Sequence, residues 1–108
     1  MQPETRTKRE FVKALRAIPG TTWTIVSQQS IRGEPDVVGC VVGFYFAFEV
    51  KEEFEDAYHK RERLQRYKLS KVMLAGGSAA IVTKESWPWW VERVRKFVDE
   101  RRSESRNT

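Results

Sequence analysis

The chain has 108 residues and a net charge of +5, a length that fits one small domain with one core and excludes two catalytic domains. A hydrophobic content of 40% with 12% aromatic residues excludes an intrinsically disordered chain. One cysteine and one histidine exclude an internal disulfide, a cysteine-based zinc cluster and a histidine-rich metal site.

The first half of the chain predicts one helix and three strands. Apolar residues at helical spacing predict an amphipathic helix over about residues 6–18, which ends before a Pro-Gly pair. Residues 23–26 are β-branched or aromatic and predict a short strand. Two further apolar runs, 36–42 and 44–51, predict a hairpin, and we expect Cys40 to be buried in it.

The second half predicts a long helix over residues 57–75, which a Gly-Gly pair ends, and a strand over 78–83. Ser86 occupies the capping position of a last helix, which ends before a flexible tail over 103–108. The order helix, strand, hairpin, helix, strand, helix predicts one α/β domain over residues 1–102, with a central mixed β-sheet flanked by helices.

One end of the predicted hairpin carries three charged residues. Alternate residues of a strand face opposite sides, so Glu49 and Lys51 share a face. Asp36 begins the partner strand, and a turn near Gly43 places it beside Glu49. Adjacent carboxylates suit a hard divalent cation such as Mg²⁺. Taken one at a time, the same residues also fit an exposed Glu-Lys pair at a strand end and an aspartate that caps a turn.

The motifs in this region resemble the PD-(D/E)XK nuclease superfamily. Gly33-Glu34-Pro35-Asp36, followed by Glu49-Val50-Lys51, resembles its bipartite signature, with 13 residues from Asp36 to Glu49. Gln65 stands 11 residues before Gly76-Gly77. That spacing is similar to the glutamine helix and glycine turn of the VRR-NUC branch, which is close to virus-type and archaeal Holliday junction resolvases. The resemblance implies a restriction-endonuclease-like core.

The resemblance also implies roles for these residues in a phosphodiester hydrolase that leaves a 5′-phosphate and a 3′-hydroxyl. Asp36, Glu49 and the backbone carbonyl of Val50 would bind Mg²⁺ or Mn²⁺. Lys51 would orient or activate the water, and Gln65 would support the site from the following helix.

The family has a further glutamate on its first helix, for which Glu4 and Glu10 are candidates. They lie six residues apart, about 9 Å along a helix, so one site cannot use both. Glu4 is better phased with Phe11 and Leu15, whereas Glu10 lies at a resolvase-like distance before the first strand. We favour Glu10 as a catalytic residue and metal ligand.

Clustered basic residues indicate a DNA-binding surface, because lysine and arginine neutralise phosphates; a solvated helix face is the alternative. The candidate DNA contacts lie before the hairpin and in the long helix: Arg32, Lys60, Arg63, Arg66 and Lys68. No stretch approaches the roughly 18 apolar residues of a membrane span, and the charged N-terminus lacks a secretion signal. We therefore expect a cytoplasmic protein, of a bacterium or a virus-infected cell, with no membrane partner.

These features predict a structure-selective DNA endonuclease, similar to a Holliday junction resolvase, that cuts branched DNA as a homodimer. The last helix has more tryptophans than its core face needs: Trp87, Trp89 and Trp90. Trp87 or Trp89 could pack in a dimer interface or on a DNA base step, and we favour the dimer interface. The alternatives are a less selective nickase or restriction-type endonuclease, and a non-catalytic DNA-binding module on the same fold.

Overall fold

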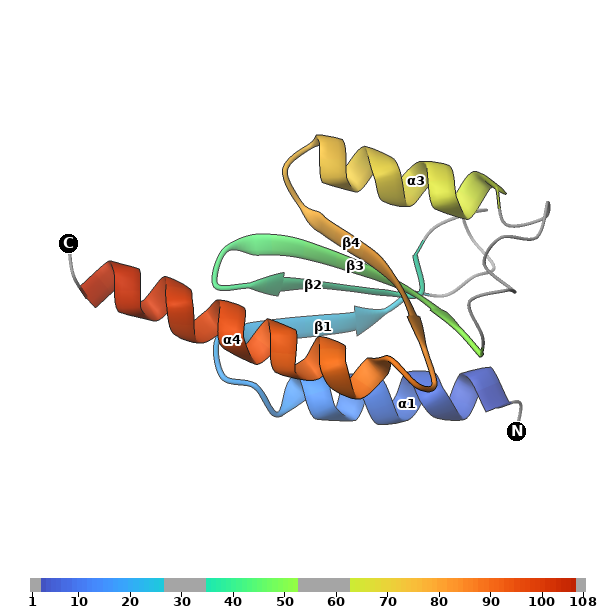
Figure 1. The fold of residues 1–108 in the computed structure, drawn as a ribbon, viewed down its shortest axis with the longest axis horizontal. Coiled ribbons are helices and arrows are strands. Elements are labelled where there is room, and N and C mark those ends of the chain that lie inside the picture. Colours follow the sequence, from blue (N-terminus) through green and yellow to red (C-terminus); the bar gives the residue numbers. More distant parts are fainter. Residues whose placement is uncertain (1–2, 27–34, 53–62, 107–108) are drawn as a thin grey trace.

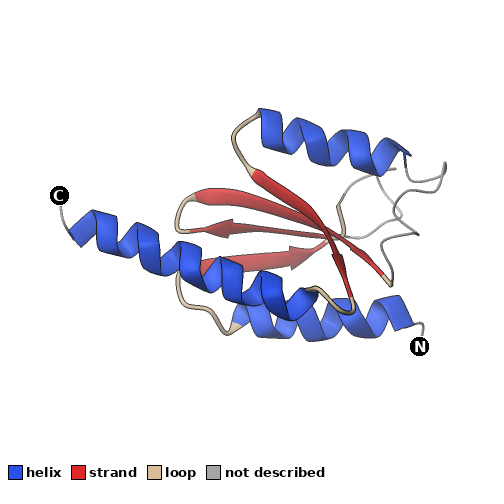
Figure 2. Cartoon of the chain, in the orientation of Figure 1, coloured by secondary structure: helices blue, strands red, loops and turns tan. Residues whose placement is uncertain are grey.

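A mixed β-sheet with helices on both faces forms the fold (Figure 1, Figure 2). The computed structural model describes residues 3–26, 35–52 and 63–106. In chain order the elements are α1 (Pro3–Arg16), β1 (Thr21–Ile25), β2 (Val37–Val41), β3 (Phe44–Lys51), α3 (Arg63–Leu74), β4 (Ser78–Thr83) and α4 (Trp87–Arg106). This arrangement confirms the predicted α/β class and the mixed sheet.

The strand order is β1-β2-β3-β4, with antiparallel pairs along β1, β2 and β3 and a parallel pair between β3 and β4. The β2–β3 hairpin turns through Val42 and Gly43, whose φ angles are 42° and 92°. Positive φ at both central residues is typical of the tight turns that match the twist of a hairpin. Val42 is β-branched and rarely adopts this conformation; its N–H donates to the carbonyl of Gly20 at 2.9 Å, which holds the turn.

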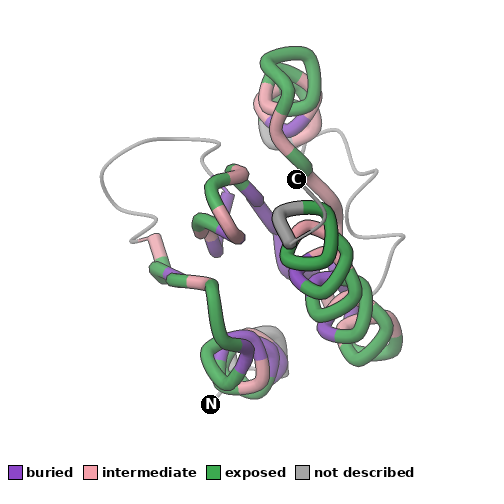
Figure 3. The backbone as a smooth tube through the Cα atoms, turned by 90° about the vertical axis from the view of Figure 1, so that its left-hand side faces the viewer, coloured by how far each residue is buried: buried purple, intermediate pink, exposed green. Residues whose placement is uncertain are grey.

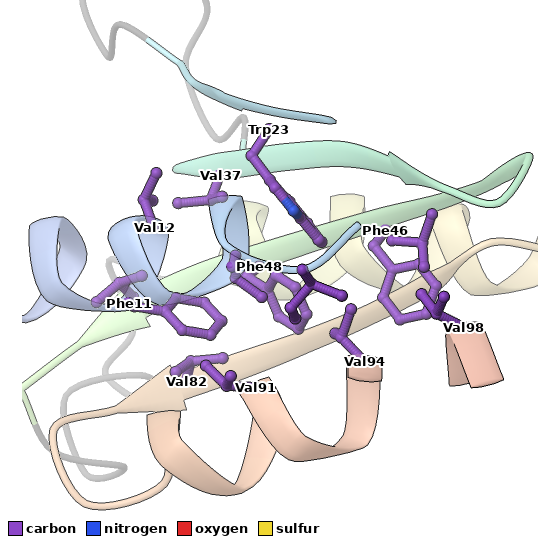
Figure 4. Close-up of a cluster of buried hydrophobic side chains, with 14 residues drawn as sticks. Phe11, Val12, Trp23, Val37, Phe46, Phe48, Val82, Val91, Val94 and Val98 are labelled. Atoms are coloured by element: carbon purple, nitrogen blue, oxygen red, sulfur yellow. The ribbon is translucent and has the colours of Figure 1, made fainter. Parts of the chain in front are cut away.

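The core lies between the sheet and the helices α1 and α4 (Figure 3, Figure 4). Phe46, Phe48 and Val50 alternate along β3 and face this core, as the strand pattern predicts. Phe11 of α1 meets the Phe48 ring edge-on, with 5.1 Å between the ring centroids. The opposite face of the sheet therefore receives the other residues of β3, including Glu49 and Lys51, and α3 covers this face (Figure 1).

Two helices differ in length from the sequence prediction. Helix α1 begins at Pro3, because proline fits the first turn of a helix, where its missing N–H needs no partner. Helix α4 continues to Arg106 and so includes the first residues of the segment 103–108 that the sequence predicts to be a flexible tail. Near the end of this helix, Arg101 pairs with Glu104 at 2.9 Å, and its guanidinium carbon lies 4.1 Å from the Phe44 ring centroid. Residues 57–62 of the predicted long helix lie outside the described residues.

The prediction that Cys40 is buried is wrong, because its side chain is exposed. Cys40 pairs with Thr22 and Tyr45, so all three lie on the face of the sheet opposite the core. Helix α3 packs on β3 and β4 and leaves this part of the face uncovered. In the described part of the chain, no helix is both long enough and apolar enough to cross a membrane.

Candidate functional site

The hairpin brings Asp36 and Glu49 side by side. Val37 pairs with Phe48 in the sheet, so the preceding residue, Asp36, lies across from the following residue, Glu49. Asp36 is 0% exposed and Glu49 is 1% exposed. The adjacency that the sequence predicts is therefore present, and it lies in a buried position. Buried carboxylates are costly unless they are paired or bind a cation, so their position calls for a specific explanation.

Asp36 is fixed through its side chain and its backbone. Its Oδ2 accepts a hydrogen bond from the N–H of Val50 at 2.9 Å, which ties the start of β2 to the end of β3. Its Oδ1 lies 3.2 Å from the Nζ of Lys8, on α1. Its carbonyl accepts a hydrogen bond from the N–H of Val26 at 2.8 Å. The carboxylate is thus held in one place before any ligand binds.

Glu49 and Lys51 form a second close pair on the same strand. The Nζ of Lys51 lies 3.7 Å from Oε1 of Glu49, and Lys51 is only 9% exposed. Lys8, Asp36, Glu49 and Lys51 together make a charged cluster of two carboxylates and two ammonium groups at one end of the sheet. A buried ion pair is weak evidence of stability, because desolvation offsets much of its attraction. Clusters of this kind are candidates for functional sites.

Lys8 is the member of the charged cluster that sequence reasoning missed. Its side chain reaches Asp36 across 28 positions of sequence, because α1 packs beside the end of the hairpin. The contact depends on how α1 crosses the sheet, and no local motif signals it. The structure therefore adds a positively charged side chain to the site, and it comes from the same helix on which the sequence predicts a carboxylate.

The structure does not bring Glu10 to the charged cluster. Glu10 is exposed on α1 and stands two residues after Lys8, about 200° around the helix axis. Glu4 belongs to the first turn of α1, four residues before Lys8. The placement of α1 therefore gives no support to Glu10, and Glu4 is left as the other candidate of the first helix.

The remaining predicted site residues lie on β3 and α3. The Val50 side chain is buried in the core, while its backbone N–H donates to Asp36. Gln65 belongs to the first turn of α3, which covers the face of the sheet that carries Glu49 and Lys51. Three candidate DNA contacts also lie on α3: Arg63, Arg66 and Lys68. Arg32 and Lys60 lie outside the described residues.

The donor chemistry of the charged cluster fits a hard divalent cation. Asp36 and Glu49 offer carboxylate oxygens side by side, which Mg²⁺ and Mn²⁺ prefer over nitrogen and sulfur ligands. Within the described residues, no group of three or more His, Cys, Asp or Glu side chains is placed to hold a metal ion. The two carboxylates would therefore depend on backbone oxygen, on water or on a further residue to complete the coordination.

Comparison with known proteins identifies the fold. No protein-family model and no curated protein matches the chain. A solved structure described as a VRR_NUC domain matches with a TM-score of 0.69, covering 85% of this chain and 97% of that chain. The chain has the fold of a VRR_NUC domain. At 18% sequence identity the likeness concerns the fold, and it confirms at that level the resemblance drawn from the motifs.

Within the VRR_NUC fold, the tryptophans at the start of α4 have different surroundings. Trp87 packs against the core, with 6.4 Å between its ring centroid and that of Phe11. Trp90 packs against the same core, with 5.6 Å between its ring centroid and that of Phe48. Trp89 is 61% exposed and meets the Trp90 ring edge-on at 4.8 Å. Trp87 is therefore accounted for within one chain, and Trp89 is the candidate for an external contact.

Proposed function

We propose that the chain is a metal-dependent endonuclease that hydrolyses phosphodiester bonds in DNA. The observation that carries this proposal is the buried Asp36–Glu49 pair beside Lys51, at the end of a hairpin in a chain with the VRR_NUC fold. Formation of strand β3 does not require charged side chains at buried positions. A purely structural role therefore does not explain the charged cluster.

Each residue of the site has a chemical role in this proposal. Asp36, Glu49 and the backbone carbonyl of Val50 would hold Mg²⁺ or Mn²⁺, with Glu4 as the carboxylate from α1. The cation, when bound, supplies Lewis-acid stabilisation of phosphate charge and lowers the pKa of a water ligand. Lys51 holds the attacking water or stabilises the charge that develops on the phosphate. Gln65 supports the site from α3.

In this proposal, DNA binds on the side of the sheet where α3 lies. Arg63, Arg66 and Lys68 add positive charge there, and Lys71 stacks over the Tyr67 ring at 5.5 Å. Contacts from such residues neutralise phosphates and position the duplex without reading its sequence. This supports a nuclease whose choice of site depends on DNA shape. We propose branched DNA, such as a four-way junction, as its substrate.

A panel of DNA substrates tests this function. Four-way, flap, nicked and linear DNA of matched sequence would be incubated with the protein and Mg²⁺, Mn²⁺ or EDTA. We expect cleavage with either metal, none with EDTA, and preference for the four-way junction. Preference for nicked or linear DNA would replace the resolvase-like proposal with a less selective nickase. Binding without cleavage under every condition would favour a non-catalytic DNA-binding module.

We propose a homodimer as the active form, because a four-way junction presents two symmetric cleavage positions that a two-fold assembly matches. Trp89 supports this proposal: it is a large exposed aromatic, and such residues are enriched in interfaces.

Trp89→Ala is therefore expected to shift the protein from dimer to monomer at about 10 µM, since interface anchors can cost about 2 kcal/mol or more when removed. Sedimentation equilibrium of the wild type and the variant measures this shift. Tyr67→Ala is the matched control, because Tyr67 is an exposed aromatic on α3, at the opposite face of the sheet. A wild type that is monomeric at tens of micromolar would exclude the dimer and the paired cuts that depend on it.

A further inference from the structure

Asp36 already has a positively charged partner that the proposed function does not use. The Nζ of Lys8 lies 3.2 Å from Oδ1 of Asp36. The other oxygen, Oδ2, accepts the backbone N–H of Val50. Since Asp36 is 0% exposed, its charge is balanced within the protein rather than by water. Oδ1 is the oxygen on which a lysine and a divalent cation would meet.

We propose that Lys8 is the resident counter-ion of Asp36 and competes with the divalent cation for this carboxylate. The inference rests on the proposed function, because it assumes that a cation binds at Asp36. An ammonium group within hydrogen-bond distance of Oδ1 repels a second cation there, and the repulsion is strong because the site is largely shielded from water. Lys8 must leave Asp36, or weaken its contact, when the cation binds.

The structure allows Lys8 to leave without disturbing the helix. Its side chain is 15% exposed and has a flexible four-carbon stem, so the ammonium group has a path to solvent. The helix itself stays in place, because its neighbours Phe11, Val12 and Leu15 are buried in the core. The contact is therefore a local one that changes independently of the fold.

Two consequences separate this role from a merely structural ion pair. In the free protein, Lys8 stabilises the buried carboxylate, so its removal lowers stability when no metal is present. In the presence of metal, removal of Lys8 takes away a competitor, so metal affinity rises. A lysine that only held the fold together would lower both stability and metal affinity when removed.

The test uses Lys8→Met, which keeps the length of the stem and removes the charge, with Lys8→Arg as the control that keeps the charge. Isothermal titration of the DNA-free protein with MnCl₂ measures metal affinity. We expect Lys8→Met to bind Mn²⁺ about 10-fold more tightly than the wild type, within the range usual for coupled binding events. The Mn²⁺ affinity of Lys8→Arg is expected to stay within about 3-fold of the wild-type affinity. Unchanged or weaker binding by Lys8→Met overturns the inference.

Thermal unfolding gives an independent readout. Without metal, the Tm of Lys8→Met is expected to lie below that of the wild type. Saturating Mn²⁺ is expected to narrow or reverse this difference in Tm, because a ligand stabilises the state that binds it. A constant difference in both conditions contradicts the competition. If Lys8→Met does not fold, Lys8→Gln removes the charge and keeps a donor to Asp36.

Asp36→Asn separates the two levels of the proposal. If the wild type binds no Mn²⁺, or if Asp36→Asn does not abolish its binding, the metal site of the proposed function is wrong. The inference about Lys8 is then wrong with it. If Asp36→Asn abolishes Mn²⁺ binding and Lys8→Met leaves the affinity unchanged, only the competition is wrong.

Discussion

Asp36→Asn and Glu49→Gln are each expected to lower DNA cleavage by more than about 100-fold, because changes to residues that only support metal ligands already cost about 10- to 100-fold. Each change removes one negative charge and almost no volume. Asp36→Asn keeps an oxygen that can accept the N–H of Val50, and Lys8 can turn toward solvent, so the fold is expected to persist. Single-turnover cleavage with saturating Mg²⁺ measures the loss, and circular dichroism checks the fold.

The matched controls for these changes are Asp99→Asn and Glu92→Gln, which alter exposed carboxylates on α4. We expect both controls to cleave at the wild-type rate, since neither residue belongs to the charged cluster. If Asp36→Asn or Glu49→Gln retained wild-type turnover with a normal fold, the assignment of these two carboxylates would be wrong.

The hairpin could be predicted from the sequence because local patterns determine it. Strict alternation along β3 sets which residues face the core, and a two-residue turn at Val42-Gly43 fixes the register. This register places Asp36 opposite Glu49. Local sequence patterns are therefore sufficient to predict that these two residues, which are separated in the sequence, lie together. The mixed sheet follows as well, because two neighbouring parallel strands need a long crossover connection, and the predicted helix between β3 and β4 supplies it.

The features that sequence reasoning missed depend on how elements cross in space. Lys8 reaches Asp36 only because α1 packs beside the end of β2, and the choice between Glu4 and Glu10 depends on the rotation of the same helix. Trp87 reaches Phe11 because α4 crosses α1. Cys40 is exposed because α3 covers β3 and β4 and not β2. Helix rotation and coverage of a sheet result from the packing of the whole core, which no local pattern encodes.

The two lysines of the charged cluster have opposite expected roles, although both contact a carboxylate. Lys8 comes from a neighbouring helix and balances Asp36 in the free protein. Lys51 lies on the same strand as Glu49, two residues away, and shares its face, so it stays beside the carboxylates whatever α1 does. A cation that is fixed to the sheet next to the site is suited to stabilise charge that develops on a phosphate.

Lys51→Met is therefore expected to lower cleavage by about 100-fold or more, the cost typical of removing one group that stabilises developing charge. DNA affinity is expected to change little, because the proposed phosphate contacts come mostly from other basic residues. Mn²⁺ affinity is not expected to fall, because no carboxylate is lost. Single-turnover cleavage, a DNA-binding titration and calorimetry with Mn²⁺ measure the three quantities on one preparation. Lys84→Met is the control: Lys84 follows Thr83, the partner of Lys51 in the sheet, and its side chain is exposed. Loss of cleavage with intact binding would place Lys51 in the chemical step. Wild-type cleavage by Lys51→Met would exclude Lys51 from the mechanism, with Asp36 and Glu49 as the remaining proposed residues.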